Sequence, residues 1–128
     1  MMLKTSTLAA AAMLVLLGSL PAAEAFAAGV RIKCEKRATR SSISVDGRDL
    51  IPGNYSAVVF SGDNRRAAPL TASIGDEVEF DFDSDPGDIG AGETSISSDF
   101  IQGGQVTGQI VDELGYTLVQ GTTRCRIR

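Results

Sequence analysis

Two cysteines constrain this chain more than any other residues, because they lie near opposite ends of the segment that follows an apolar N-terminal stretch. Cys34 and Cys125 are the only cysteines in the sequence, and each lies in a short run that carries basic residues. In an oxidising compartment such a pair forms a disulfide. A bridge that closes a loop of about 90 residues contributes about 4–5 kcal/mol in the chain-entropy model. The pair therefore predicts one domain whose first and last strands are covalently linked.

The N-terminus has the three parts of a secretory signal. Lys4 provides the positive charge, residues 8–20 form an apolar stretch too short to span a membrane, and small residues follow it. We expect residues 1–27 to be a signal peptide and residues 28–128 to be the mature domain, periplasmic or secreted, with no membrane span. An uncleaved N-terminal anchor is the alternative.

The mature segment predicts an all-β domain. Val78, Phe80 and Phe82 alternate with acidic residues, which is the period of a half-buried strand. Asp46-Gly47 is expected to form a tight turn. We expect loops at Ser61–Arg66 and Asp83–Gly92, and a further strand at Thr94–Ile101. Short runs separated by turn signals, without an amphipathic helix, predict a single antiparallel β-sandwich of about seven or eight strands.

The segment Leu50-Ile51-Pro52-Gly53-Asn54-Tyr55 resembles the L-x-P-G-x-Y turn of many secreted bacterial immunoglobulin-like and prealbumin-like sandwiches. The resemblance implies an immunoglobulin-like or prealbumin-like sandwich in which Tyr55 begins a core strand. Because this turn occurs in proteins of unrelated function, it implies nothing about activity.

Charge is segregated along the sequence. No Lys or Arg lies between Arg66 and Arg124, whereas eleven acidic residues do. The basic candidates for binding an anionic partner are Arg31, Lys33, Arg65, Arg66, Arg124, Arg126 and Arg128. Alternation predicts that the basic residues of the terminal strands share an outward face, above inward-facing Ile32, Cys34, Cys125 and Ile127. A solvated face that discourages edge pairing is the alternative.

The acidic run from Asp81 to Asp88 is a candidate calcium site, because calcium favours clustered oxygen ligands on a flexible loop. The candidate ligands are Asp81, Asp83, Asp85, Asp88 and Glu93. The run begins like an EF-hand loop, but Pro86 and Gly92 replace the glycine and glutamate that such a loop needs. A calcium site of another kind is therefore the hypothesis. A solvated acidic turn and a surface for a basic partner are the alternatives.

The residues that are missing narrow the chemistry. The chain has no histidine, which excludes Ser-His-Asp and Cys-His nucleophilic sites and histidine-ligated metal centres. Nucleic-acid binding is not expected of an exported acidic protein without aromatic residues among its basic ones. We expect a non-catalytic interaction module that binds a protein or an anionic surface polymer through charged faces and loops. A calcium-stabilised structural domain of an envelope or surface assembly is the alternative, and a small carboxylate hydrolase is a distant third.

Overall fold

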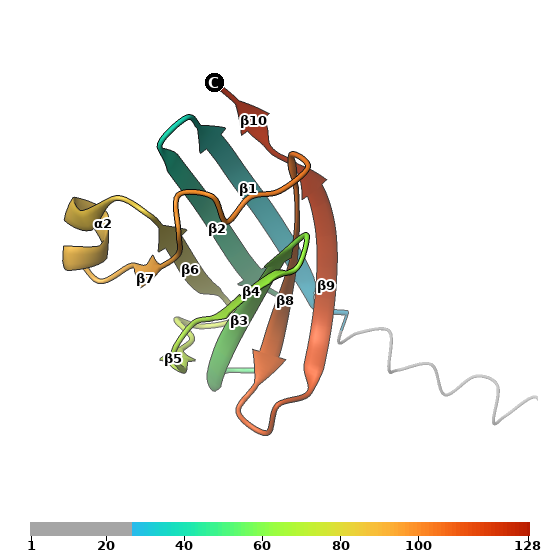
Figure 1. The fold of residues 1–128 in the computed structure, drawn as a ribbon. Coiled ribbons are helices and arrows are strands. Elements are labelled where there is room, and N and C mark those ends of the chain that lie inside the picture. Colours follow the sequence, from blue (N-terminus) through green and yellow to red (C-terminus); the bar gives the residue numbers. More distant parts are fainter. Residues whose placement is uncertain (1–26) are drawn as a thin grey trace, which may run out of the picture.

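The computed structural model describes residues 27–128, so the predicted signal peptide, apart from Ala27, lies outside the described residues. Within this range two sheets pack face to face (Figure 1). Sheet A contains, in spatial order, β10 (Arg126–Ile127), β1 (Gly29–Arg37), β2 (Arg40–Arg48), β6 (Val78–Asp83) and β7 (Thr94–Ser95). Sheet B contains β4 (Asn64–Ala67), β3 (Asn54–Ser61), β8 (Gln105–Asp112) and β9 (Thr117–Arg124), with β5 (Thr71–Ala72) beside β3. The predicted β-sandwich is confirmed.

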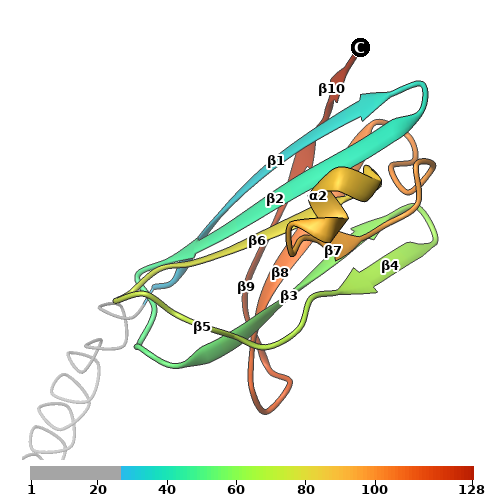
Figure 2. The same cartoon turned by 90° about the vertical axis from the view of Figure 1, so that its left-hand side faces the viewer.

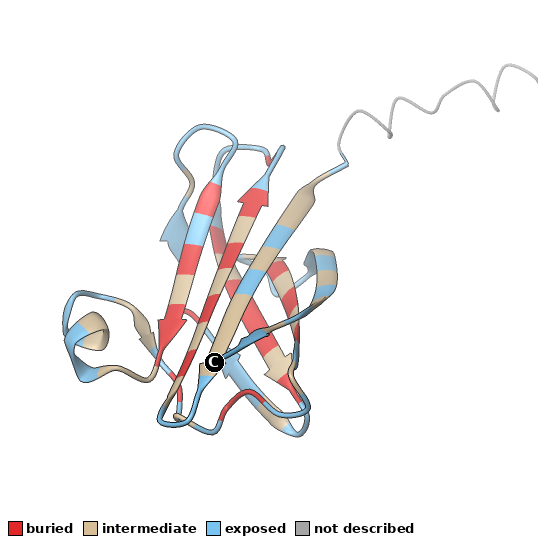
Figure 3. Cartoon of the chain, turned by 90° about the horizontal axis from the view of Figure 1, so that it is seen from above, coloured by how far each residue is buried: buried red, intermediate tan, exposed pale blue. Residues whose placement is uncertain are grey.

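Period-two alternation places the core between the sheets, as the sequence predicts. Val78, Phe80 and Phe82 of β6 are buried. Glu79, which lies between two of them in the sequence, is exposed on the outer face of sheet A. Figure 3 shows the same alternation as bands of buried and less buried residues along the strands. Each large apolar side chain that is fully buried contributes about 1.5–3 kcal/mol, so this pattern is the main source of the fold's stability.

The predicted disulfide between Cys34 and Cys125 is confirmed, and it lies where the chain crosses from one sheet to the other. β9 ends in sheet B at Arg124, and β10 follows in sheet A, parallel to β1. The bridge therefore links the two sheets as well as the two terminal strands. The predicted inward direction of Ile127 is wrong, since this residue is 63% exposed. β10 lies at the edge of sheet A, beyond the last residue of β9, and sheet B does not cover it there.

Asp46-Gly47 is not a turn, contrary to the prediction. Both residues lie within β2, and the chain turns after it at Asp49, which has a φ of 57°. Gly47 is buried on the same side of β2 as Val45. An Asp-Gly pair often marks a turn because glycine adopts positive φ. Here glycine is instead needed because neighbouring side chains pack directly against the strand.

Replacing Gly47 with alanine is expected to destabilise the domain. A Cβ at this position would lie 3.1 Å from Leu50 and from Val78, and 3.2 Å from Ile110, all of which are buried. Overpacking of this kind costs about 1–3 kcal/mol, which urea denaturation of Gly47→Ala should detect as a lower free energy of unfolding. Gly90→Ala is the matched control, since nothing lies within 4 Å of its Cβ position. Equal losses in both variants would contradict the packing argument.

Two predicted loops contain regular structure. β4 forms inside the predicted loop Ser61–Arg66 and pairs with the end of β3. The predicted loop Asp83–Gly92 contains one short helix, α2 (Pro86–Gly90). It begins there because the Asp85 side chain accepts a hydrogen bond from the Gly87 backbone nitrogen at 2.8 Å, and proline suits the first helical position. No helix in the described part of the chain has the length and apolar character needed to cross a membrane.

The predicted strand Thr94–Ile101 is a strand only at β7, which pairs in parallel with the end of β6. After β7 the backbone is irregular, yet Ile96, Phe100 and Ile101 are buried in the core. The Asn64 side chain of β4 donates a hydrogen bond to the Phe100 carbonyl at 2.8 Å. Figure 2 shows the segment passing between the edges of the two sheets. Burial of apolar side chains, rather than strand pairing, therefore holds it in place.

The expectation that Tyr55 begins a core strand is confirmed. Tyr55 is the second residue of β3 and is buried, and its hydroxyl donates a hydrogen bond to the Ile51 carbonyl. That bond satisfies the polar end of an otherwise apolar side chain.

Candidate functional site

The predicted calcium ligands separate into two groups in the structure. Asp83, Asp88 and Glu93 come from the end of β6, from α2 and from the residue before β7. One carboxylate oxygen of each lies within 4.8 Å of the others. Asp81 and Asp85 do not belong to this group. The three grouped carboxylates are called the acidic cluster below.

An arginine that sequence reasoning missed lies against the acidic cluster. Arg40 donates hydrogen bonds from Nε to Asp83 Oδ1 at 3.0 Å and from Nη2 to Asp83 Oδ2 at 2.7 Å. Its Nη2 also hydrogen-bonds to Asp88, and its Nη1 lies 3.6 Å from Asp85 Oδ2. Two parallel bonds to one carboxylate make a strong and directional contact. The guanidinium therefore provides the positive charge that the sequence hypothesis assigned to calcium.

Strand register explains the position of Arg40. Ser42 of β2 lies opposite Asp83 of β6, and Arg40 is two residues before Ser42. Side chains two residues apart on a strand share a face, so Arg40 reaches Asp83 along the outer face of sheet A. The two residues are 43 positions apart in the sequence. No local pattern marks a contact of that separation, which is why the sequence alone did not reveal it.

Burial and ion pairing act in opposite directions on the carboxyl groups of this site. Burial raises the pKa of Asp83, but hydrogen bonds from Arg40 and from the Asp85 backbone outweigh it, and the pKa lies below its usual value. The hydrogen bond to Asp83 in turn raises the pKa of Arg40. For Glu93, burial and the charges of Asp88 and Asp83 all raise the pKa. Within the acidic cluster, Arg40 forms salt bridges with Asp83 and Asp88 but not with Glu93.

Calcium binding at the acidic cluster stays a prediction. Repulsion between carboxylates was the physical reason to expect a cation, and Arg40 already relieves that repulsion for Asp83 and Asp88. Asp85 is also committed locally, because its Oδ1 accepts the hydrogen bond that caps α2. The geometry therefore accounts for much of the acidic run without a metal ion.

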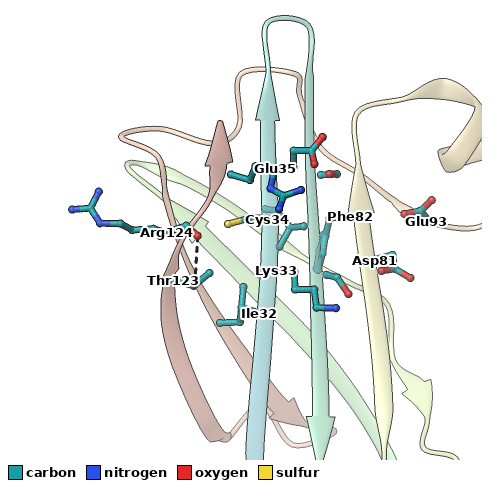
Figure 4. Close-up of a pocket in the computed structure, with 13 residues that line it drawn as sticks. Ile32, Lys33, Cys34, Glu35, Asp81, Phe82, Glu93, Thr123 and Arg124 are labelled. Carbon is teal, nitrogen blue, oxygen red and sulfur yellow. Dashed lines mark hydrogen bonds between the residues drawn. The ribbon is translucent and has the colours of Figure 1, made fainter. Parts of the chain in front are cut away.

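The basic residues predicted on one face divide between the two sheets. Arg31 and Lys33 are exposed on the outer side of β1, and Arg126 of β10 joins them because it lies opposite Glu35. Arg124 belongs to β9 of sheet B, and Figure 4 shows its side chain extending away from Lys33, on the other side of β1. Only part of the predicted basic surface therefore exists.

The remaining basic candidates have other surroundings. Arg65 and Arg66 lie on β4, at the far edge of sheet B, and the Arg65 guanidinium lies 5.9 Å from the centre of the Phe60 ring. Arg128 Nε lies 3.7 Å from Glu35 Oε2. Arg65 and Arg66 therefore lie apart from the surface formed by Arg31 and Lys33, whereas Arg128 lies beside it and is paired with Glu35.

The outer face of sheet A carries charges of both signs in separate columns. Three rows cross it, formed by Arg31, Asp46 and Glu79, by Lys33, Ser44 and Asp81, and by Glu35, Ser42 and Asp83. We define the basic column as Arg31, Lys33 and Arg126, and the acidic column as Glu79 and Asp81. β2 separates Arg31 and Lys33 of β1 from the acidic column on β6, so these are two strand spacings, or about 10 Å, apart, and Arg126 on β10 lies one spacing farther away. Within residues 27–128, no side chain of either column forms a salt bridge.

A groove with a volume of about 610 Å³ crosses β1 and β2 and extends to Thr123 and Arg124 of β9, and the column residues that line it are Lys33, Arg126 and Asp81 (Figure 4). Ser42 and Ser44 of β2 line its floor, where short side chains leave the face hollow. Its walls include Lys33 and Glu35 on one side and Asp81 and Glu93 on the other. The groove therefore offers hydroxyl groups in the middle and carboxylates on one side, whereas the other side carries Lys33 beside Glu35, which is salt-bridged to Arg37 and Arg128.

No family model matches this chain, and none of the curated proteins matches its sequence. Function is therefore inferred from the residues of the chain itself.

Proposed function

We propose that this protein is an exported, non-catalytic interaction module that binds a protein partner through the outer face of sheet A. The observation that carries the proposal is the separation of a basic column and an acidic column by a serine-lined groove. Charges that form no internal salt bridge add little to folding stability, but they can select and orient a partner with the complementary pattern.

The presence of both signs favours a protein partner over an anionic polymer. A polymer chain attracted to the basic column would lie about 10 Å from the acidic column, which is within a Debye length at an ionic strength of about 0.1 M. Repulsion from Glu79 and Asp81 would offset part of the attraction to Arg31 and Lys33. A protein surface that itself carries both signs avoids this conflict.

Two features of the chain support the non-catalytic and exported parts of the proposal. The sequence contains no histidine, which is the commonest general base in enzymes. Both cysteines form the disulfide, so the described residues contain no free thiol. A disulfide is compatible with an oxidising, exported location. A binding role needs only the charged face that the fold presents.

Charge reversal on this face should abolish capture of the partner. Lys33→Glu and Asp81→Lys each place a like charge against a complementary partner, so each should reduce the partner recovered from the native envelope or culture fluid by about tenfold or more. Arg66→Glu, on the far edge of sheet B, is the matched control and should leave recovery unchanged. Quantitative mass spectrometry of cross-linked complexes measures the recovery.

The same variants test the polymer alternative on an immobilised acidic polysaccharide. Retention that Lys33→Glu removes and Asp81→Lys strengthens would assign the face to an anionic polymer. If Arg66→Glu reduces the recovery of the partner as much as Lys33→Glu does, net charge governs binding and this face does not.

A further inference from the structure

We infer that the partner of the outer face of sheet A is a second copy of this chain, so that the protein forms a two-fold symmetric dimer through this face. The inference rests on the proposed function of the face. It follows from the order of the columns, which is self-complementary.

The symmetry argument uses only the order of three strands. β1 carries Arg31 and Lys33 of the basic column, β2 the serines and β6 the acidic column. Consider two copies that meet face to face about a two-fold axis, which lies over β2 and runs parallel to the strands. The rotation exchanges the β1 side of the face with the β6 side. The basic column of each copy then faces the acidic column of the other. An axis across the strands would place like columns together, so charge selects the first arrangement.

Charges match in two of the three rows in this arrangement, whereas the third row places Glu35 opposite Asp83 of the second copy, and both of these residues are salt-bridged within their own chain. Arg31 faces Glu79 of the second copy, and Lys33 faces Asp81 of the second copy, since each pair shares a row of the sheet. Ser44 lies near the axis, where its short side chain lets the two sheets approach. The strands of the two faces run nearly parallel, as in aligned sheet packing.

The size of the face predicts a weak dimer. The strands of sheet A contain 28 residues, and at a rise of about 3.3 Å and a spacing of about 4.8 Å they cover about 450 Å² for each copy, or about 900 Å² in total. That total lies below the range of stable specific interfaces and is typical of transient ones. Asp46 also lies in the first row on β2 and meets its own copy near the axis, which opposes association. The dimer should therefore form at high protein concentration and low salt.

Sedimentation of the disulfide-bonded protein purified after export tests the inference. Wild-type protein between about 10 μM and about 1 mM should show a monomer–dimer equilibrium at about 20 mM salt that dissociates at about 500 mM. Lys33→Glu and Asp81→Lys should each be monomeric across this range, because each variant alone places like charges opposite one another at both copies of the row.

An equimolar mixture of the two variants should dimerise again. In the mixed dimer, the glutamate of the Lys33→Glu chain faces the lysine introduced in the Asp81→Lys chain. The unchanged Asp81 of the first chain faces the unchanged Lys33 of the second. Both pairs are then of opposite charge, as they are in the wild-type dimer.

The mixture is the decisive arm, and it also shows that both variants are folded. Restored dimer in the mixture confirms the face and the symmetry together. Dimers that persist in each variant alone, or a wild-type protein that stays monomeric at about 1 mM and about 20 mM salt, would overturn the inference. If the wild-type protein is monomeric but its binding of another protein still depends on Lys33 and Asp81, the dimer is excluded and the proposed function stands. If that binding is unchanged in both variants, the proposed function is excluded as well.

Discussion

Replacing Cys34 and Cys125 together with serine is expected to lower the free energy of unfolding by about 4 kcal/mol, the largest loss foreseen for this chain. The two residues are 91 positions apart, so the bridge closes almost the whole described domain into one loop. Without it, the unfolded chain gains the entropy of that open loop. The domain also loses its link at the crossing between the sheets. Urea denaturation of the oxidised protein and of the double variant measures the difference.

Chemical reduction of the wild-type protein is the control for this experiment. It removes the bridge without changing the side-chain atoms apart from the added hydrogens, so it should reproduce most of the loss. A loss below about 1 kcal/mol in both cases would mean that the link contributes little beyond what packing already provides. A loss in the double variant but not on reduction would point to the serine hydroxyls instead of the missing bridge.

Replacing Asp83 with asparagine is expected to cost about 2 kcal/mol at neutral pH, because it removes a carboxylate that is only 3% exposed and accepts two hydrogen bonds from Arg40. The cost stays below that of a fully buried pair, because Arg40 is partly open to solvent. The pKa of Asp83 is lower in the folded than in the unfolded protein. Its stabilising effect is therefore complete above about pH 4 and is lost as the pH falls through the folded pKa.

Thermal unfolding of wild type and Asp83→Asn as a function of pH checks this prediction. The difference in melting temperature should be constant from about pH 5 to about pH 7 and should shrink below about pH 4. A difference that does not change with pH would show that the ionised form of Asp83 is not what stabilises the site.

Glu93→Gln is the matched variant with the opposite sign. Burial and the neighbouring carboxylates raise the pKa of Glu93, so its ionised form destabilises the folded protein at neutral pH. Removing this charge should raise the melting temperature at neutral pH, with no effect below about pH 4, where wild-type Glu93 is protonated as well. The calcium hypothesis predicts otherwise: about 10 mM calcium would stabilise wild type, and Glu93→Gln would lose that response.

Features that depend on local pattern were predictable. The alternation around Phe80 identified β6 and its buried side, and the turn before Tyr55 located the start of β3. Both follow from the strand period and from turn chemistry, which act between residues close in sequence. The prediction of a turn at Asp46-Gly47 was wrong because contacts between residues distant in sequence, and not the local pattern, decide this position. Gly47 is required by contacts with Leu50, Val78 and Ile110, of which the last two are distant in sequence.

The sequence by itself therefore determined the two-sheet fold, the disulfide and the sides of β1 and β6 that face the core. Only the tertiary structure decided that β2 lies between β1 and β6. That order places Arg40 against Asp83 and brings the basic and acidic columns onto one face with a serine groove between them. The physical reason is that a period of two specifies which face a side chain takes, whereas the choice of neighbouring strands depends on long-range pairing and packing that no local pattern encodes.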